Sequence, residues 1–107
     1  MTAATDYLEN EVLDHILGEG TRDFVSPPNL YIGLFTAVAD GEAGTVTEVA
    51  GNAYARTGAN FSAAVSGSSA NTGDITFPTA TGGNWGVLTH AGIYDAATDG
   101  NLLFYGA

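Results

Sequence analysis

The two histidines of this sequence, His15 and His90, are the side chains best suited to act as a general base near neutral pH. A base supports catalysis only beside a nucleophile or an acid. The sequence contains no G-x-S-x-G motif, no phosphate-binding glycine loop and no H-E-x-x-H motif. His15 falls on the polar side of a predicted helix and His90 in a predicted strand. We therefore predict that the protein is not an enzyme.

The segment "DAATDGN" places three oxygen-bearing side chains close together, those of Asp95, Asp99 and Asn101. Oxygen ligands suit Ca²⁺, although this spacing lacks the alternate ligands and the closing glutamate of an EF-hand loop. Asp, Gly and Asn are also the residues that a hairpin turn requires. We expect a structural turn and no cofactor, and we keep the three residues as candidate metal ligands.

Arg56 is one of only two cations in the sequence, the other being Arg22. Its predicted strand position near Tyr54 favours an ion pair with a carboxylate such as Glu48, and a contact to another subunit is the alternative. Trp85, in "GGNWGV", is expected to anchor the core, with a role at an interface as the alternative.

One helix and several short strands must position these residues. Residues 6–17 carry an apolar stripe at helical spacing, with Asp6 and Glu9 resembling a capping box and Gly18 and Gly20 as the stop. The stripe consists of Leu8, Val12, Leu13, Ile16 and Leu17.

The rest of the chain is predicted to be mainly β. Strands are expected within residues 29–37, 53–61, 74–77, 87–94 and 102–105, and residues 38–52 are expected to form a polar loop. We predict one domain over residues 1–107, with the helix at about 6–17 and the β part at about 29–107. Its architecture would be a compact antiparallel β-sandwich or barrel of short strands, with the amphipathic helix on one face or end.

The first predicted strand has apolar residues on both of its faces. Leu30, Ile32 and Leu34 face one way, while Tyr31 and Phe35 face the other, so both faces require cover. The last predicted strand should be fixed by sheet pairing and lie at or near a subunit contact.

Composition narrows the classes of partner. Twelve carboxylates against two cations give a net charge of −10, which disfavours direct binding to nucleic acid or to anionic lipid. No run approaches the roughly 20 apolar residues of a membrane helix, and the start "MTAATDYLENEVLDHILGEG" does not resemble a secretory signal peptide. We expect no nucleic-acid or membrane partner, and a soluble protein that is made inside a cell.

Four blocks of the sequence carry a resemblance: "DYLENEVLDHILG", "PPNLYIGLFTA", "EVAGNAYART" and "NTGDITFPTATGGNWGVLTHAGIYDAATDGNLLFYGA". Together they resemble a family of small tailed-bacteriophage virion proteins that are often labelled phage tail fibre proteins. The resemblance covers nearly the whole chain. It implies a virion structural protein made in a bacterial host.

Within that family, the small size favours a head decoration (cement) protein on the capsid surface. It would contact the major capsid protein and copies of itself, as a trimer or another small homo-oligomer. The alternatives are a small tail-associated or tail-fibre protein, or a carbohydrate- or Ca²⁺-binding attachment module in which Trp85, Tyr94 and Tyr105 stack on sugars. The candidate structural or interface residues are Glu48, Tyr54, Arg56, Trp85, Leu102, Leu103, Phe104 and Tyr105.

Overall fold

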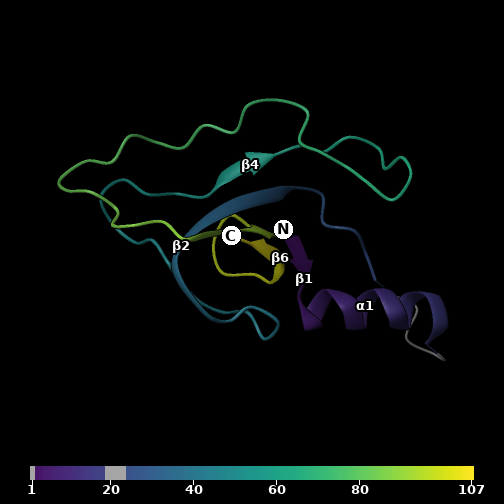
Figure 1. Ribbon diagram of the computed structural model, residues 1–107. Helices are drawn as coiled ribbons and strands as arrows, with labels where there is room; N and C mark the ends of the chain where they lie inside the picture. The colour runs from purple at the N-terminus through teal and green to yellow at the C-terminus, as the bar shows by residue number, and fades with distance from the viewer. Residues whose placement is uncertain (1, 19–23) are drawn as a thin grey trace.

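The computed structural model of the protein describes residues 2–18 and 24–107, so Gly20 and Arg22 lie outside the described residues. Within these two ranges, six strands and one helix follow one another (Figure 1): β1 (Thr2–Ala4), α1 (Asp6–Leu17), β2 (Leu30–Asp40), β3 (Thr45–Glu48), β4 (Thr57–Ala59), β5 (His90–Tyr94) and β6 (Leu102–Gly106). Among the described residues, no helix has the length and apolar character needed to cross a membrane.

The helix predicted over residues 6–17 is confirmed, but its cap differs from the prediction. Thr5, not Asp6, is the N-cap, and its side chain accepts a hydrogen bond from the Leu8 amide. The same hydroxyl donates to the carbonyl of Leu102 at 2.7 Å, and Thr5 is 1% exposed. The cap therefore joins the start of α1 to β6. At the other end, the amide of Gly18 donates to the carbonyl of Asp14.

The six strands form one antiparallel sheet in the order β1-β6-β5-β2-β3, and β4 also pairs with β2. The mainly β antiparallel fold with a single N-terminal helix is confirmed. In a sandwich, two facing sheets enclose the core between them. Here all the strands belong to one sheet, and the bend of β2 (Figure 1) encloses the core instead.

β2 is the strand that the other elements share. One of its edges pairs with β5 over residues 31–35. Its other edge is divided between two strands, because β4 pairs with residues 30–32 and β3 with residues 35–40. The backbone around Leu34 therefore faces a gap between β4 and β3, and its polar groups need other partners.

The core on the inner side of this bend is small. Phe35 is 0% exposed and packs edge-to-face on Tyr94, with ring centroids 6.0 Å apart, and Leu102 completes the cluster. Gly92 makes this packing possible, since a Cβ atom there would lie 2.8 Å from the Phe35 ring and 2.6 Å from Leu102. Large side chains from β2, β5 and β6 therefore meet over a glycine.

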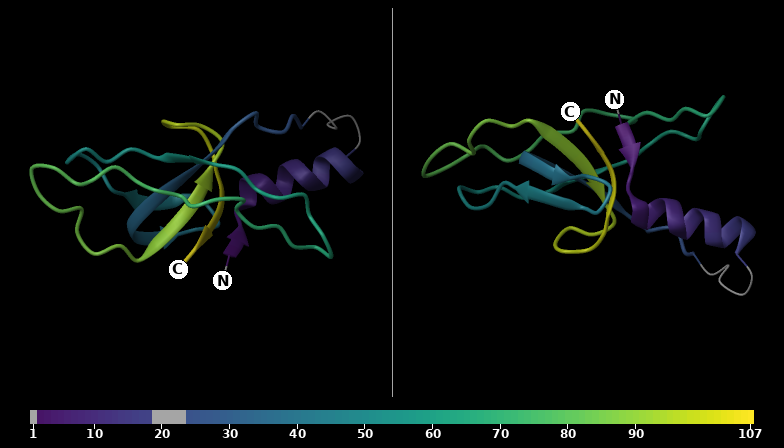
Figure 2. Two further views of the ribbon diagram at one scale, coloured as in Figure 1. Left: turned by 90° about the horizontal axis from the view of Figure 1, so that it is seen from above. Right: turned by 60° about the horizontal axis from the view of Figure 1, so that its bottom comes forward.

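Two strand predictions were too long, one was wrong, and one strand was missed. The strand expected over residues 53–61 is limited to β4, that expected over 87–94 is limited to β5, and residues 74–77 contain no strand. Conversely, residues 38–52 are not only a loop, because β2 continues to Asp40 and β3 returns beside it through two register shifts. From residue 60 to 89 the chain runs as a long irregular excursion (Figures 1 and 2), part of which, around Phe61 and Ser68, lines a hollow with Ile93 and Phe104 of the sheet.

β6 lies between β1 and β5, so sheet pairing on both of its sides fixes it, as expected. The helix is less covered than its apolar stripe predicted. None of its residues is buried, and Leu13, Ile16 and Leu17 are 53%, 60% and 69% exposed. α1 lies against β6 and then projects away from the sheet (Figure 2).

Candidate functional site

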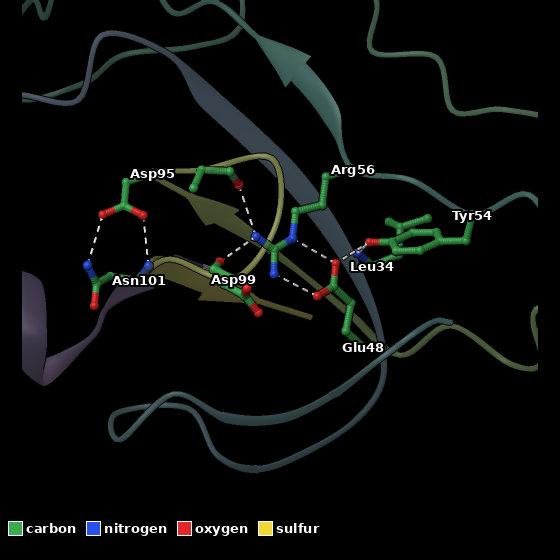
Figure 3. A network of polar contacts seen from close by, with 8 residues as sticks. Leu34, Glu48, Tyr54, Arg56, Asp95, Asp99 and Asn101 are labelled. Carbon is green, nitrogen blue, oxygen red and sulfur yellow. Dashed lines mark hydrogen bonds and ion pairs between the residues drawn. The ribbon is translucent and has the colours of Figure 1, made fainter. Parts of the chain in front are cut away.

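The most connected side chain of the described protein is that of Arg56, which immediately precedes β4. Its Nε donates to Oε2 of Glu48 at 2.9 Å, and its Nη2 donates to Oε1 of the same carboxylate at 2.8 Å (Figure 3). The side chains of Arg56 and Glu48 are 8% and 22% exposed. The ion pair expected from the sequence is therefore present, in the two-pronged geometry that a guanidinium forms with a carboxylate.

The remaining face of the guanidinium holds the β5–β6 turn. Nη1 of Arg56 donates to the carbonyl of Ala96 at 2.9 Å and to that of Asp99 at 2.7 Å. The guanidinium carbon also lies 3.4 Å from the centroid of the Tyr94 ring, a cation–π contact. A single side chain thus joins β3, β4 and the turn that follows β5.

Tyr54 connects this ion pair to the gap on the edge of β2. Its hydroxyl donates to Oε2 of Glu48 at 2.6 Å and accepts from the Leu34 amide at 2.9 Å (Figure 3). The Leu34 carbonyl accepts from the Val49 amide at 3.0 Å. The backbone groups of Leu34 that neither β4 nor β3 reaches are therefore satisfied.

The network shifts the acidity of its members. Burial of Glu48 acts to raise its pKa, but the hydrogen bonds from Arg56 and Tyr54 outweigh it, and the pKa lies below its ordinary value. Burial, followed by the hydrogen bond to Glu48, raises the pKa of Tyr54. The carboxylate therefore stays charged and the phenol stays protonated near neutral pH.

Aromatic residues extend the network into the long excursion. The Tyr54 ring stacks on Phe77 at 6.3 Å and meets Trp85 edge-on at 5.4 Å. The indole of half-buried Trp85 donates to the carbonyl of Asn52 at 2.9 Å. Trp85 therefore anchors the irregular segment to Tyr54 rather than entering the cluster around Phe35.

The candidate metal ligands form a turn that is closed by hydrogen bonds. Asp95 accepts from the backbone amide of Asn101 at 2.7 Å and from its side-chain amide at 3.0 Å. Asp99 adopts a positive φ of 52°, and its carbonyl faces Arg56. Within the described residues, the three acidic side chains close enough to share an ion are instead Asp6, Glu9 and Glu42.

A hollow of about 460 Å³ lies beside the network, between the β2–β3 connection, the start of α1 and the β5–β6 turn. Arg56, Glu48 and Tyr94 form part of its lining. His15 and His90 do not line it. Of the charged groups that line it, Arg56 and Glu48 bind each other, and Arg56 also binds the turn, so this pair fixes three loops in place.

The sequence-predicted residues separate into three locations. Glu48, Tyr54, Arg56 and Trp85 come together in the network just described. Leu102 and Leu103 are buried, at 6% and 4% exposure. Half-buried Phe104 lies on the face of the sheet opposite to Phe35. The Tyr105 hydroxyl donates a hydrogen bond to Glu42 at 2.8 Å. Whether any of them contacts another subunit stays a prediction.

Sequence analysis missed the role of Tyr94 beneath Arg56 and of the carbonyls of Ala96 and Asp99. Backbone acceptors leave no trace in residue types, so these carbonyls carried no signal. Tyr94 did carry a signal, because side chains alternate along a strand and this alternation places Tyr94 on the same face of β5 as Gly92.

Comparison with known proteins provides the identity of the chain. A family model described as "Podophage GP4 fiber I protein gp80" matches residues 3–107. None of the curated proteins compared with the chain matches it. The matched range includes all of the network and the whole sheet except its first residue. The chain therefore belongs to the podophage GP4 fiber I protein gp80 family, a family of phage virion structural proteins.

Proposed function

We propose that this chain is a small structural component of a phage tail fibre. The observation that carries the proposal is the family match, which spans residues 3–107 and whose description names a podophage fibre protein. The head-decoration role that the sequence analysis favoured, with the major capsid protein as partner, has less support than its tail-fibre alternative because the description names a fibre.

The fold supports a role in assembly rather than catalysis. Arg56 and Glu48, the charged pair of the best-formed site, bind each other and the backbone, so they hold β3, β4 and the β5–β6 turn together. The chain measures 51 × 29 × 23 Å along its principal axes, with the helix projecting from the sheet (Figure 2). Its outer surface is therefore large for its small core, which suits a protein that works through contacts with neighbours.

Immunogold labelling of intact phage particles tests the proposal. Residues 62–74 are all exposed, so an antibody raised against this segment has an accessible epitope on the chain. We expect gold on tail structures in electron micrographs. The control is the same antibody after adsorption with the purified chain, which should remove the labelling. Gold confined to heads would refute the fibre assignment and favour the decoration role.

A further inference from the structure

The turn between β5 and β6 has two consecutive residues with positive φ, Asp99 at 52° and Gly100 at 73°. This is the geometry for which hairpin turns select Asn-Gly or Asp-Gly pairs. A larger residue does not fit at Gly100, since a Cβ atom there would lie 2.5 Å from Oδ1 of Asp95 and 2.7 Å from the Ala96 Cβ. The turn that Arg56 binds therefore favours an aspartate followed by a glycine.

An Asp-Gly pair is also prone to cyclise, because no side chain on the glycine hinders attack by its amide nitrogen on Cγ of the aspartate. Both reacting groups are available in this turn. Within the part of the chain that the structure describes, neither the Asp99 carboxylate nor the Gly100 amide has a hydrogen-bond partner. Both residues are exposed and line the hollow of about 460 Å³ beside the network, so water reaches them.

The chain contains a second Asp-Gly pair, Asp40 and Gly41, in different surroundings. Oδ1 of Asp40 accepts a hydrogen bond from the Ala43 amide at 3.3 Å, and Asp40 pairs with Thr45 in the sheet. Gly41 is buried, and a Cβ atom there would collide with the Tyr105 ring, so the backbone has little space in which to turn. The same dipeptide is thus restrained here, which makes it an internal control.

We propose that Asp99 is a modification site, at which the backbone rearranges spontaneously to isoaspartate. The Gly100 nitrogen bonds to Cγ of Asp99 and loses its proton, and the protonated side-chain carboxyl releases one oxygen as water, which leaves a cyclic succinimide. Water then adds to the main-chain carbonyl carbon of Asp99, the bond from that carbon to the Gly100 nitrogen breaks, and a free carboxylate remains. The chain now runs through Cβ and Cγ and is one atom longer.

Arg56 is placed to direct this ring opening. Its Nη1 donates to the main-chain carbonyl oxygen of Asp99 at 2.7 Å (Figure 3), and negative charge develops on that oxygen when water adds. A cationic donor already aimed at this oxygen stabilises the adduct, as an oxyanion hole does. Among the described residues, the side-chain carbonyl has no such donor, and opening there restores aspartate. The folded chain should therefore favour isoaspartate.

Incubation of the purified full chain, followed by chymotrypsin digestion and electron-transfer mass spectrometry, tests the proposal. Isoaspartate should form at Asp99 at least about tenfold faster than at Asp40, where ring closure must first break a hydrogen bond and displace packing. A synthetic peptide of residues 97–102 shows when an unrestrained Asp-Gly pair has rearranged. Equal rates at the two positions of the chain would overturn the proposal, and so would unmodified Asp99 after the peptide has rearranged.

Matched variants locate the reaction in the intact chain. Labelling with an isoaspartyl methyltransferase should lose most of its signal in Asp99→Gly, which removes the reacting carboxyl and tolerates the positive φ. Asp40→Ser should keep the signal. The opposite result would place the reaction at Asp40 and overturn the assignment, and far-UV circular dichroism checks that both variants fold.

The role of Arg56 has its own readout. Asp99→Asn reaches the same succinimide by losing ammonia, and the ratio of isoaspartate to aspartate in its products should be higher in the folded chain than in concentrated urea. Equal ratios would overturn the directing role of Arg56. The modification does not depend on the fibre assignment, so gold labelling confined to heads would refute that assignment and leave this site intact.

Discussion

Replacing Arg56 with leucine should remove the interaction that holds three loops together. The substitution deletes two hydrogen bonds to Glu48 and two to the carbonyls of Ala96 and Asp99. It also removes the contact with the Tyr94 ring. The carboxylate would then keep the Tyr54 hydroxyl as its remaining hydrogen-bond donor in this network. Leaving one charge of a buried pair without its partner is the costly step.

The expected loss follows from burial. Breaking a buried ion pair by removing one partner costs about 3–5 kcal/mol of unfolding free energy. The Glu48 side chain is 22% exposed, so water solvates part of the orphaned carboxylate and the loss should fall near about 3 kcal/mol. A chain of this size has an unfolding free energy of about 5–15 kcal/mol. The variant should therefore lose between a fifth and more than half of its stability.

Urea unfolding followed by tryptophan fluorescence measures this loss. Trp85 is the single tryptophan and meets the Tyr54 ring edge-on, so its emission reports on the network. Arg56→Lys should lose less than Arg56→Leu, because it keeps the charge but not the two-pronged geometry. The double variant Glu48→Leu/Arg56→Leu should be more stable than the sum of the two single losses implies, since no charge is left unpaired.

The control removes a carboxylate outside the network. Asp74→Asn changes an exposed residue and should alter stability by less than about 0.5 kcal/mol. Additive effects of the Glu48 and Arg56 substitutions would refute the reasoning, and so would a loss from Arg56→Leu below about 1 kcal/mol.

Three further outcomes are expected. The pKa of Glu48 lies below its ordinary 4.5 in the folded protein, so ionised Glu48 should stabilise the fold above pH 4.5, and this stabilisation should be lost as the pH falls through the lowered pKa. Urea melts of Glu48→Gln at a series of pH values should lack this pH-dependent loss of stability. Gly92→Ala should lower the free energy of unfolding by about 1–3 kcal/mol and the thermal midpoint with it, whereas Gly73→Ala, whose added Cβ meets nothing within 4 Å, should lower neither. Thermal melts in Ca²⁺ and in chelator should coincide, since Asn101 already occupies the oxygens of Asp95.

Local patterns predicted the elements whose signals are strong and self-contained. The apolar stripe at helical spacing predicted the bounds of α1. The apolar runs before and after the Asp95–Asn101 turn predicted the β5–β6 hairpin. The ion pair of Arg56 with Glu48 followed from the scarcity of cations. These features depend on residues that are near in sequence or that have few chemical alternatives.

Elements that depend on a distant partner were not predictable in the same way. The β-branched run "TVTE" becomes β3 because β2 extends to Asp40 and offers it an edge. Residues 74–77 have a similar character, but β4 already occupies the edge of β2 near Ile32, so they remain irregular. The helix stripe predicted burial that the described chain does not provide.

The pairing of β1 with β6 has a mechanical consequence. Thr2 lies opposite Gly106, so both strands leave the sheet at the same corner (Figure 1). Tension applied between these two residues would peel β1 from β6 one register at a time, because antiparallel neighbours pulled from a common end separate sequentially instead of sliding together. Such a joint resists pulling weakly. If the chain serves in a fibre as proposed, load would therefore have to pass through the flanks of this subunit and not along its backbone.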